Sequence, residues 1–178
     1  MPDRLRPDLL LEDAFWPTPD VLFERLRSEV AWESEMAARQ TASFGVPYNY
    51  AQMVYPAAPM HPLLVPVAER LEARLGIRFN NCLLNFYPNE RSKMGFHSDD
   101  TTELREGSGV AIVSVGHARD ITFRRRDEPE VRWAVTLGPG SLLYMENAVQ
   151  AEWVHAIKRV KRPLGPRISL TWRAFVRA

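Results

Sequence analysis

The second half of the chain consists of short segments rich in β-branched and aromatic residues, separated by Gly and Pro, and this pattern constrains the fold most strongly. Seven such segments within roughly 95 residues have the length and composition of strands. Strands this short and this closely spaced predict a sandwich or barrel of the jelly-roll kind. The predicted strands cover residues 82–87, 109–115, 120–125, 131–137, 141–145, 153–157 and 167–176.

The first half of the chain predicts two helices. Asp20 is a suitable N-cap for a helix over residues 20–32, in which apolar residues recur at helical spacing. A second helix is predicted over residues 62–75, because Gly76 then occupies the position at which helices commonly end. Residues 39–59 carry several Gly, Pro and Tyr residues and are expected to be irregular.

The length of 178 residues predicts a single domain over residues 1–178. An N-terminal helical part over about residues 1–78 is expected to brace a β core over about residues 79–178. The expected fold class is therefore α+β and mainly β, with a jelly-roll core and bracing N-terminal helices.

Composition excludes several other classes of protein. Charged residues make up 25% and hydrophobic residues 46%, which excludes a disordered chain. The sequence lacks an apolar run long enough to span a membrane and an N-terminal signal peptide, so a cytoplasmic location is expected. Cys82 is the only cysteine, and a fold that depends on its hydrophobic core in a reducing compartment is expected.

The net charge of +1 conceals an uneven distribution. Residues 156–178 carry seven basic side chains and no acidic one, so residues 1–155 carry a net charge of −6. A local basic feature of this kind predicts either a solvated surface or a patch that faces phosphate groups.

A histidine and a carboxylate stand two positions apart at His97 and Asp99. On an extended strand both side chains would point to the same side and could bind one metal ion. His155 is available as a third ligand, and two histidines with one carboxylate form the metal site of non-haem Fe(II) oxygenases. A His-x-Asp pair also occurs often by chance. His61 and His117 have no acidic partner at a useful spacing and are expected to be surface residues.

Strict alternation along the last predicted strand separates an apolar face from a polar face. The polar face consists of Arg167, Ser169, Thr171 and Arg173. It fits either an edge strand exposed to solvent or a lined pocket, in which the planar guanidinium groups would bind carboxylates. Asn85 and Tyr87 share one face of another predicted strand and could contribute an amide and a phenol to the same anion.

Taken in order, these elements resemble the AlkB-type Fe(II)/2-oxoglutarate-dependent dioxygenases, which remove alkyl groups from nucleic-acid bases by oxidation. The resemblance extends over about residues 39–175 and includes the segments at 107–111 and 140–143. The motifs that carry it are Asn85-x-Tyr87, His97-x-Asp99, His155 and Arg167-x-Ser169-x-Thr171-x-Arg173. The resemblance implies a double-stranded β-helix, in agreement with the jelly-roll prediction.

The resemblance also implies a role for each site residue. The catalytic Fe(II) would be bound by His97, Asp99 and His155. The co-substrate 2-oxoglutarate would be bound by Asn85, Tyr87, Arg167, Thr171 and Arg173, with Arg167 at its distal carboxylate and Arg173 nearer the metal. The implied reaction consumes O2, with ascorbate as an assisting reductant. It hydroxylates the alkyl carbon on a base, releases an aldehyde and yields succinate and CO2.

The implied partner is an alkylated nucleic acid. Residues 39–59 overlap the segment where the family places a base-recognition lid, and Tyr48 and Tyr50 are predicted to face a base or the backbone. The alternative is that both tyrosines merely cover the sheet. The predicted phosphate contacts are Arg39, Lys158, Arg159, Lys161 and Arg162.

Three positions depart from the family pattern. Thr101 stands where nucleic-acid repair members often carry an acidic residue, and Ser169 replaces an asparagine. Residues 32–39 are too few for the long hairpin that probes duplexes. We therefore expect a monomer that acts on single-stranded DNA or RNA. Two other functions are a 2-oxoglutarate-dependent hydroxylase or demethylase of a protein side chain or small metabolite, and a binding module without turnover. The complete residue set argues against the binding module.

Overall fold

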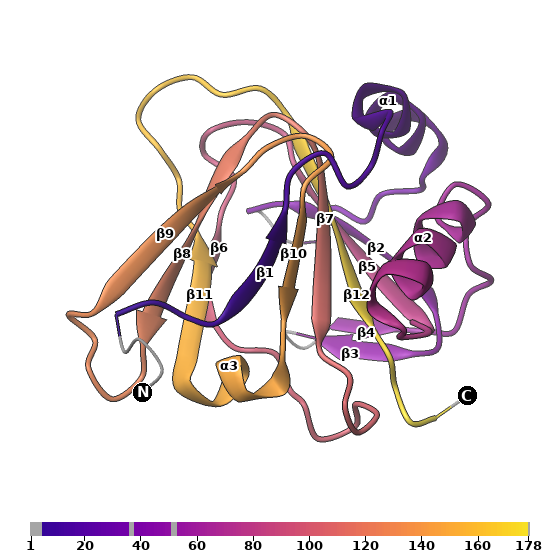
Figure 1. Ribbon diagram of the computed structural model, residues 1–178. Coiled ribbons are helices and arrows are strands. Elements are labelled where there is room, and N and C mark those ends of the chain that lie inside the picture. The colour runs from indigo at the N-terminus through magenta and orange to yellow at the C-terminus, as the bar shows by residue number, and fades with distance from the viewer. Residues whose placement is uncertain (1–4, 36–37, 51–52, 178) are drawn as a thin grey trace.

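The computed structural model describes residues 5–35, 38–50 and 53–177, apart from the side chain of Tyr50. Two antiparallel sheets face each other, and a separate hairpin lies beside them (Figure 1). The major sheet contains, in order, β1 (Leu9–Glu12), β10 (Leu142–Met145), β7 (Val110–Gly116), β12 (Arg167–Arg173), β5 (Asn81–Tyr87) and β2 (Gln40–Gly45). The minor sheet contains β6 (Met94–His97), β11 (Trp153–Ile157), β8 (Arg119–Arg125) and β9 (Arg132–Leu137). The hairpin consists of β3 (Tyr48–Tyr50) and β4 (Met53–Tyr55). These sheets confirm the predicted mainly β, α+β class with a jelly-roll core.

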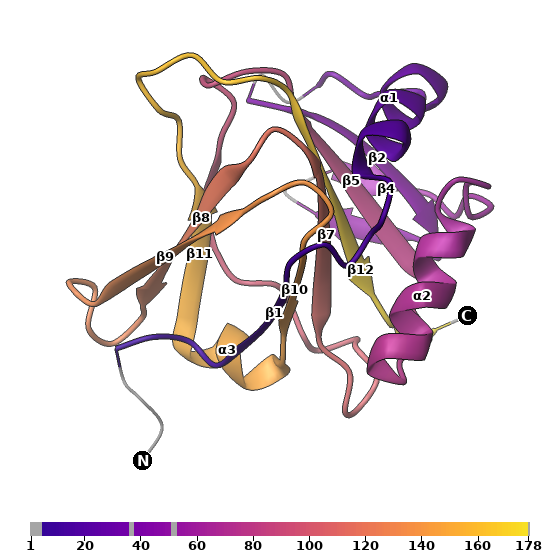
Figure 2. The same ribbon diagram turned by 45° about the horizontal axis from the view of Figure 1, so that its top comes forward.

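Two helices, α1 (Pro19–Glu29) and α2 (Val65–Leu75), cover the outer face of the major sheet, as Figures 1 and 2 show. Helix α1 starts with Pro19, whose fixed φ suits the first helical position, so Asp20 lies in the first turn and is not the N-cap. It ends earlier than predicted, because Val30 is extended with φ −83° and ψ 136°. Helix α2 ends as predicted at Gly76, which has φ 69°.

Strand β12 lies at the centre of the major sheet, paired with β5 on one side and β7 on the other. The edge-strand alternative for this segment is therefore wrong. Its apolar residues Ile168, Leu170 and Trp172 pack with residues of the two helices in one hydrophobic cluster. Its polar residues face the space between the sheets, and all seven residues of the strand are buried. Buried polar side chains in this position require partners, which makes the face a candidate site.

The segment 39–59 differs most from expectation, because most of its described residues form the strands β2, β3 and β4. Strand β2 pairs with β5 along its whole length, and β3 and β4 form the hairpin. The prediction of an irregular segment is wrong because a neighbouring strand supplies the pairing that weak local alternation did not indicate. The last strand ends at Arg173, three residues early, and Phe175 forms only an isolated bridge with Leu104.

Three short elements were not predicted. They are β1, β6 and the six-residue helix α3 (Asn147–Glu152), which joins β10 to β11. Cys82 is buried and free, as expected. Among the described residues, no helix combines the length and the apolar character needed to cross a membrane.

Candidate active site

The metal-ligand candidates converge between β6 and β11. Antiparallel pairing places His155 directly opposite His97, the last residue of β6, and Asp99 follows in the next loop. One ligand atom from each of the three residues lies within 4.8 Å of the other two. The two imidazole rings have centroids 4.4 Å apart, and His155 Nε2 lies 3.6 Å from Asp99 Oδ2. The predicted convergence of two histidines and one carboxylate is therefore present in the structure.

Burial and neighbouring charges set the protonation of this group. Burial raises the pKa of Asp99, but the Arg173 guanidinium and the two histidines outweigh it and hold the pKa at about 2. Burial also lowers the pKa of His155 to about 4, against the attraction of Asp99. At neutral pH the carboxylate is ionised and His155 is neutral. Both are the forms in which these side chains bind metal ions.

Two further residues orient the ligands. The Asp99 backbone N–H donates to Gln150 Oε1 of α3 at 2.8 Å. His97 Nδ1 lies 2.9 Å from the carbonyl oxygen of Gly95, a hydrogen bond that requires the proton on Nδ1 and leaves the Nε2 lone pair for a metal. Sequence reasoning missed Gln150, because nothing in its own segment links it to Asp99.

Strand register assembles the candidate co-substrate pocket across the major sheet. Arg167 lies opposite Tyr87, and Ser169 lies opposite Asn85 on one side and Ser114 on the other. Thr171 follows on the same face of β12, towards Arg173. Arg173 donates to Asp99 Oδ1 and so links the pocket to the metal ligands. The five residues that the resemblance assigns to 2-oxoglutarate therefore lie on two adjacent strands and on the same face of the major sheet.

Hydrogen-bond donors in this pocket lack acceptors among the described residues. Arg167 is 1% exposed and donates through Nη2 to Ser114 Oγ at 2.8 Å, but its Nε and Nη1 have no acceptor. The Tyr87 hydroxyl also forms no hydrogen bond of normal geometry, although it lies close enough to Arg167 to attract the guanidinium. Burial lowers the pKa of Arg167 to about 10, so it is a cation at neutral pH. Because buried polar groups are normally paired, these donors indicate an anionic ligand, and a carboxylate of 2-oxoglutarate fits them.

Arg39 belongs to this pocket and not to the phosphate-facing surface. It is 7% exposed, and its Nε donates to Asn85 Oδ1 at 2.8 Å. The prediction that Arg39 contacts phosphate is therefore corrected. The reason is tertiary: β2 pairs with β5 and brings the residue that precedes β2 beside Asn85.

Tyr48 and Tyr50, which were predicted to face a base or the backbone, are the first and last residues of β3. Tyr48 is buried, and the Arg173 guanidinium carbon lies 4.5 Å from its ring centroid. Its ring also lies 5.6 Å from that of Phe175. Tyr48 thus covers the metal end of the pocket, while the side chain of Tyr50 lies outside the described part of the chain.

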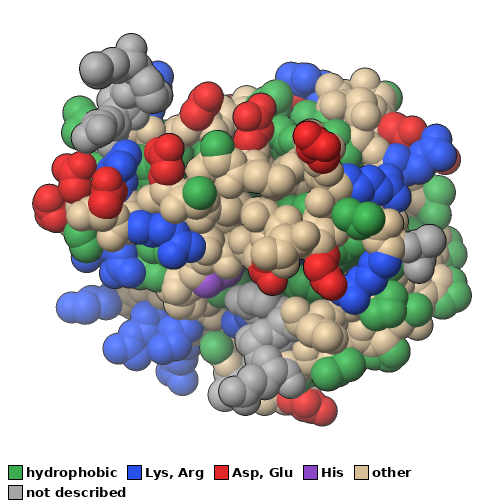
Figure 3. Space-filling model, turned by 90° about the horizontal axis from the view of Figure 1, so that it is seen from below, with side chains coloured by type: hydrophobic (Ala, Val, Ile, Leu, Met, Phe, Trp, Pro, Cys, Tyr) green, Lys and Arg blue, Asp and Glu red, His purple; other side chains and the backbone are tan. Residues whose placement is uncertain are grey.

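Basic side chains gather around one phenyl ring next to the metal ligands. Phe96 precedes His97, and its ring centroid lies 4.2 Å from the Arg124 guanidinium carbon, 5.9 Å from that of Arg132 and 5.4 Å from Lys158 Nζ. We call these four residues the Phe96 cluster. Among the described residues, no carboxylate forms an ion pair with its three cations. On the face seen from below, one group of Lys and Arg side chains lies at the lower left of Figure 3, and others lie along the right.

The predicted phosphate contacts other than Arg39 are exposed. Lys158, Arg159, Lys161 and Arg162 lie in the loop between β11 and β12, drawn in yellow at the upper left of Figure 1. His117 is exposed and His61 half-buried, both away from the metal ligands.

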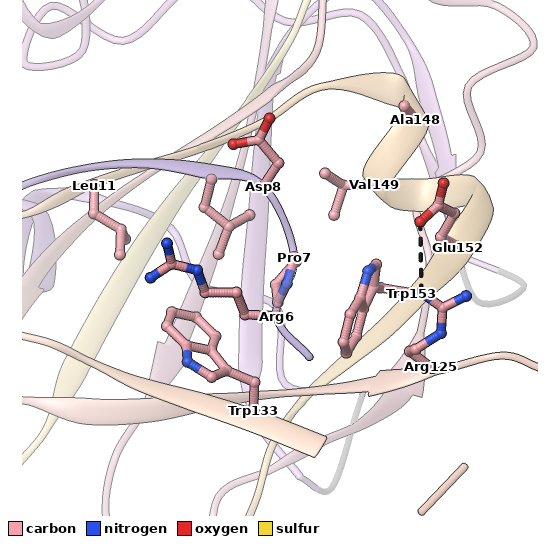
Figure 4. A pocket seen from close by; sticks show the side chains of 11 residues that line it. Arg6, Pro7, Asp8, Leu11, Arg125, Trp133, Ala148, Val149, Glu152 and Trp153 are labelled. Carbon is pink, nitrogen blue, oxygen red and sulfur yellow. Dashed lines mark ion pairs between the residues drawn. The ribbon is translucent and has the colours of Figure 1, made fainter. Parts of the chain in front are cut away.

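A cavity of about 830 Å³ lies outside the candidate site (Figure 4). It is bordered by the N-terminal segment, α3 and the indoles of Trp133 and Trp153. Arg125 and Glu152 form an ion pair at its edge, with an N–O distance of 3.8 Å. No metal-ligand or co-substrate candidate lines this cavity.

Known proteins share this arrangement of sequence and fold. A family model described as the 2OG-Fe(II) oxygenase superfamily matches residues 11–173. The chain is 32% identical to Alpha-ketoglutarate-dependent dioxygenase alkB homolog 3 of Homo sapiens, over 86% of this chain and 60% of that protein. It is 31% identical to DNA oxidative demethylase ALKBH2 of Homo sapiens, over 88% of this chain and 69% of that protein.

A solved structure, that of OsALKBH1, superimposes with a TM-score of 0.70 at 15% sequence identity, over 96% of this chain and 100% of that one. This likeness concerns the fold. The chain spans 60–62% of the length of the alkB homolog 3 proteins that it matches.

Proposed function

Because this chain belongs to the AlkB family of 2OG-Fe(II) oxygenases, we propose that it removes alkyl groups by oxidation from the bases of single-stranded DNA or RNA. The observation that carries the proposal is the position of the Phe96 cluster, because its three cations surround the ring of Phe96, the residue directly before the metal-ligand candidate His97. Relatives named as a DNA oxidative demethylase support the substrate class.

His97, Asp99 and His155 would hold Fe(II) in this proposal. The Arg173 guanidinium keeps Asp99 ionised, and Gln150 fixes the backbone on which Asp99 stands. Neither Asp99 nor His155 has to lose a proton at neutral pH before it binds a cation.

The Arg167 and Tyr87 donors would hold the distal carboxylate of 2-oxoglutarate. Asn85 and Thr171 would line the middle of the pocket, and Arg173 would lie at the metal end. When bound, the iron and 2-oxoglutarate supply the oxidation of an alkyl C–H bond by O2, with succinate and CO2 as co-products. A hydroxylated N-alkyl carbon then leaves the base as an aldehyde, and the base nitrogen recovers a proton.

The Phe96 cluster offers a path for the strand that carries the alkylated base. Consecutive residues of a strand point to opposite faces, so Phe96 lies on the outer face of the minor sheet when His97 points to the site. Strand β6 is the edge of that sheet. A nucleic-acid strand whose phosphates contact Arg124, Arg132 and Lys158 can therefore turn a base over this edge towards the metal ligands.

The short connection between α1 and β2 favours a single-stranded substrate. Only residues 30–39 separate the two elements, and the described part of this connection forms one isolated β-bridge, between Glu33 and Thr41. The described part of this connection offers no long hairpin that could replace an extruded base inside a duplex stack.

The proposal is tested with the purified protein, Fe(II), 2-oxoglutarate and ascorbate in air. Single-stranded and double-stranded oligonucleotides with N-methylated bases are the substrates, and mass spectrometry follows the loss of the methyl group together with succinate formation. We expect demethylation that is faster on single strands. His155→Ala should abolish it, while Arg27→Gln on the distant helix α1 should not change it.

Absence of succinate under all conditions would overturn the enzyme assignment. Succinate that forms without base repair would instead favour the alternative substrate class, a protein side chain or a small metabolite. Equal or faster repair of duplexes would contradict the single-strand preference.

A further inference from the structure

Arg119, the first residue of β8, is a buried cation outside the set assigned above. It is 3% exposed and forms no ion pair with any carboxylate of the described residues. Its guanidinium donates instead to three backbone carbonyl oxygens, those of Asn89 at 3.3 Å, Ser92 at 3.0 Å and Lys158 at 2.8 Å. A buried cation whose hydrogen bonds all go to carbonyl groups is costly, because the carboxylates of Asp120 and Glu90 attract it only from beyond ion-pair distance.

The three acceptors belong to two loops. Asn89 and Ser92 lie between β5 and β6, and Lys158 begins the loop between β11 and β12. Glu90 joins the same loops directly, because its carbonyl oxygen accepts from Val160 N–H at 3.0 Å and its carboxylate from Leu164 N–H at 3.4 Å. Arg119 therefore lies where the two loops meet.

Arg119 also borders the distal end of the co-substrate pocket. Its guanidinium carbon lies 5.8 Å from the centroid of the Tyr87 ring, and that of Arg167 lies 5.3 Å from the same centroid. Two buried cations thus share one aromatic ring, and neither has a carboxylate partner among the described residues. A carboxylate bound by Arg167 would relieve their mutual repulsion.

The same residue reaches the nucleic-acid side through Lys158. The carbonyl oxygen of Lys158 accepts from Arg119, while its Nζ lies in the Phe96 cluster. The Arg119 guanidinium therefore links the candidate co-substrate pocket to the backbone of Lys158, a member of the Phe96 cluster.

We propose that Arg119 is a positioning residue that couples the binding of the distal carboxylate of 2-oxoglutarate to the placement of Lys158 for a nucleic-acid strand. This inference rests on the proposed function. The loop between β11 and β12 would have two states. In the docked state Arg119 donates to the Lys158 carbonyl oxygen, and in the released state this hydrogen bond is absent. The carboxylate favours the docked state because it lowers the cost of holding Arg119 beside Arg167. By linkage, each ligand then strengthens the binding of the other.

The first test compares two co-substrates that differ only in the distal carboxylate. Dissociation constants for 2-oxoglutarate and 2-oxopentanoate are measured by calorimetry on the Mn(II)-loaded protein without O2, so that no turnover is needed. Arg119→Lys keeps the charge but lacks the planar fork that reaches three carbonyls. We expect this variant to raise the dissociation constant of 2-oxoglutarate by about 5-fold or more. The dissociation constant of 2-oxopentanoate should rise much less.

Arg70→Lys is the matched control. Arg70 donates to the Phe15 carbonyl oxygen at 2.7 Å, and its guanidinium carbon lies 5.4 Å from the Phe15 ring centroid. These are the same kinds of contact as those of Arg119, but they are made from α2 and not at the site. The control should leave both dissociation constants unchanged. A loss of equal size for both 2-oxo acids in Arg119→Lys would reveal a merely structural role and overturn the proposal.

The second test measures coupling by fluorescence anisotropy of a labelled single-stranded oligonucleotide on the Mn(II)-loaded protein. We expect 2-oxoglutarate to tighten binding by the wild-type protein and to leave binding by Arg119→Lys unchanged. The same tightening in both proteins would overturn the coupling. Failure of the wild-type protein to bind any oligonucleotide would instead overturn the proposed substrate class and the coupling with it, while the 2-oxo acid comparison would still decide whether Arg119 positions the pocket.

Discussion

Asp99 lies among three groups that favour its ionised form, and the residue-scale chemistry of the site follows from that placement. Arg173 contacts it from β12, His155 from β11 and His97 from β6. A carboxylate that is buried without such partners would be protonated and would bind a metal poorly. At the other end of the pocket, Arg167 and Tyr87 have buried donors without acceptors, and a bound anion would satisfy them.

Tyr87→Phe tests whether the Tyr87 hydroxyl contributes to 2-oxoglutarate binding or to the stability of the fold. The hydroxyl forms no hydrogen bond of normal geometry within the described residues, so its removal should change the free energy of unfolding by less than about 1 kcal/mol. Loss of a hydrogen bond to a carboxylate should lower the affinity for 2-oxoglutarate about tenfold. Urea denaturation and calorimetric titration measure the two quantities. Strong destabilisation with unchanged affinity would show that the hydroxyl has a structural role instead.

Gln150→Leu should lower metal affinity although Gln150 is not a ligand candidate. The change leaves the buried Asp99 N–H without its acceptor and loosens the loop that carries the carboxylate. Outer residues that orient metal ligands contribute about 10- to 100-fold to affinity. Titration with Mn(II), followed by electron paramagnetic resonance, measures the loss. Glu152→Gln, at the exposed end of the same helix, is the control, and an equal loss there would count against the orienting role.

At the scale of elements, β12 is central because one of its faces packs in the hydrophobic core and the other lines the candidate site. Leu170 belongs to the hydrophobic cluster that also contains residues of α1 and α2, and Thr171 faces the minor sheet. Central pairing with β5 and β7 holds both faces in register with the residues that they need. The helices therefore stabilise the sheet from outside, and the site occupies its inside.

Leu170→Ala should destabilise the fold without altering the pocket. Leu170 is fully buried, and such truncations cost about 2–5 kcal/mol of unfolding free energy. The fraction that remains folded should bind 2-oxoglutarate with unchanged affinity, because the side chain points away from the pocket. Thr171→Val should show the opposite result, with weaker 2-oxoglutarate binding and little change in stability. Thermal unfolding and calorimetry distinguish the two variants, and an exchange of these outcomes would refute the assignment of faces.

At the scale of the whole molecule, the net charge does not describe how the charged side chains are distributed over the surface. The net charge is +1, yet basic side chains concentrate around the Phe96 cluster and the loop at 158–162. Two arginines of the basic C-terminal stretch, Arg167 and Arg173, are buried in the site and cannot contact phosphate groups at the surface. The surface for nucleic acid is thus formed by several elements that are distant in sequence.

Salt dependence measures this surface. Replacement of Arg132 or Lys158 by Gln should each reduce the slope of log affinity against log salt concentration by about 0.7 for a single strand. Anisotropy titrations of a labelled oligonucleotide at several salt concentrations give the slopes. Arg27→Gln on α1 should leave the slope unchanged. Slopes that do not respond to Arg132→Gln and Lys158→Gln would place the strand elsewhere on the protein.

The sequence by itself determined the strand-rich core, the two helices and the order of the metal and co-substrate motifs. These are local properties: alternation along β12 and the spacing of His97 and Asp99 lie within single segments, where periodicity and residue type decide. The resemblance to a known family added the roles, because several spaced motifs occur in one order.

Only the tertiary structure decided which segments meet. Arg39 was expected at the surface but bonds to Asn85, because β2 pairs with β5. Gln150 supports Asp99 from a helix about 50 residues away, and Arg119 joins two loops that no sequence pattern connects. Such contacts depend on how sheets pack and on which strands become neighbours. That choice is made by the burial of the whole apolar surface and leaves no signal in any single segment.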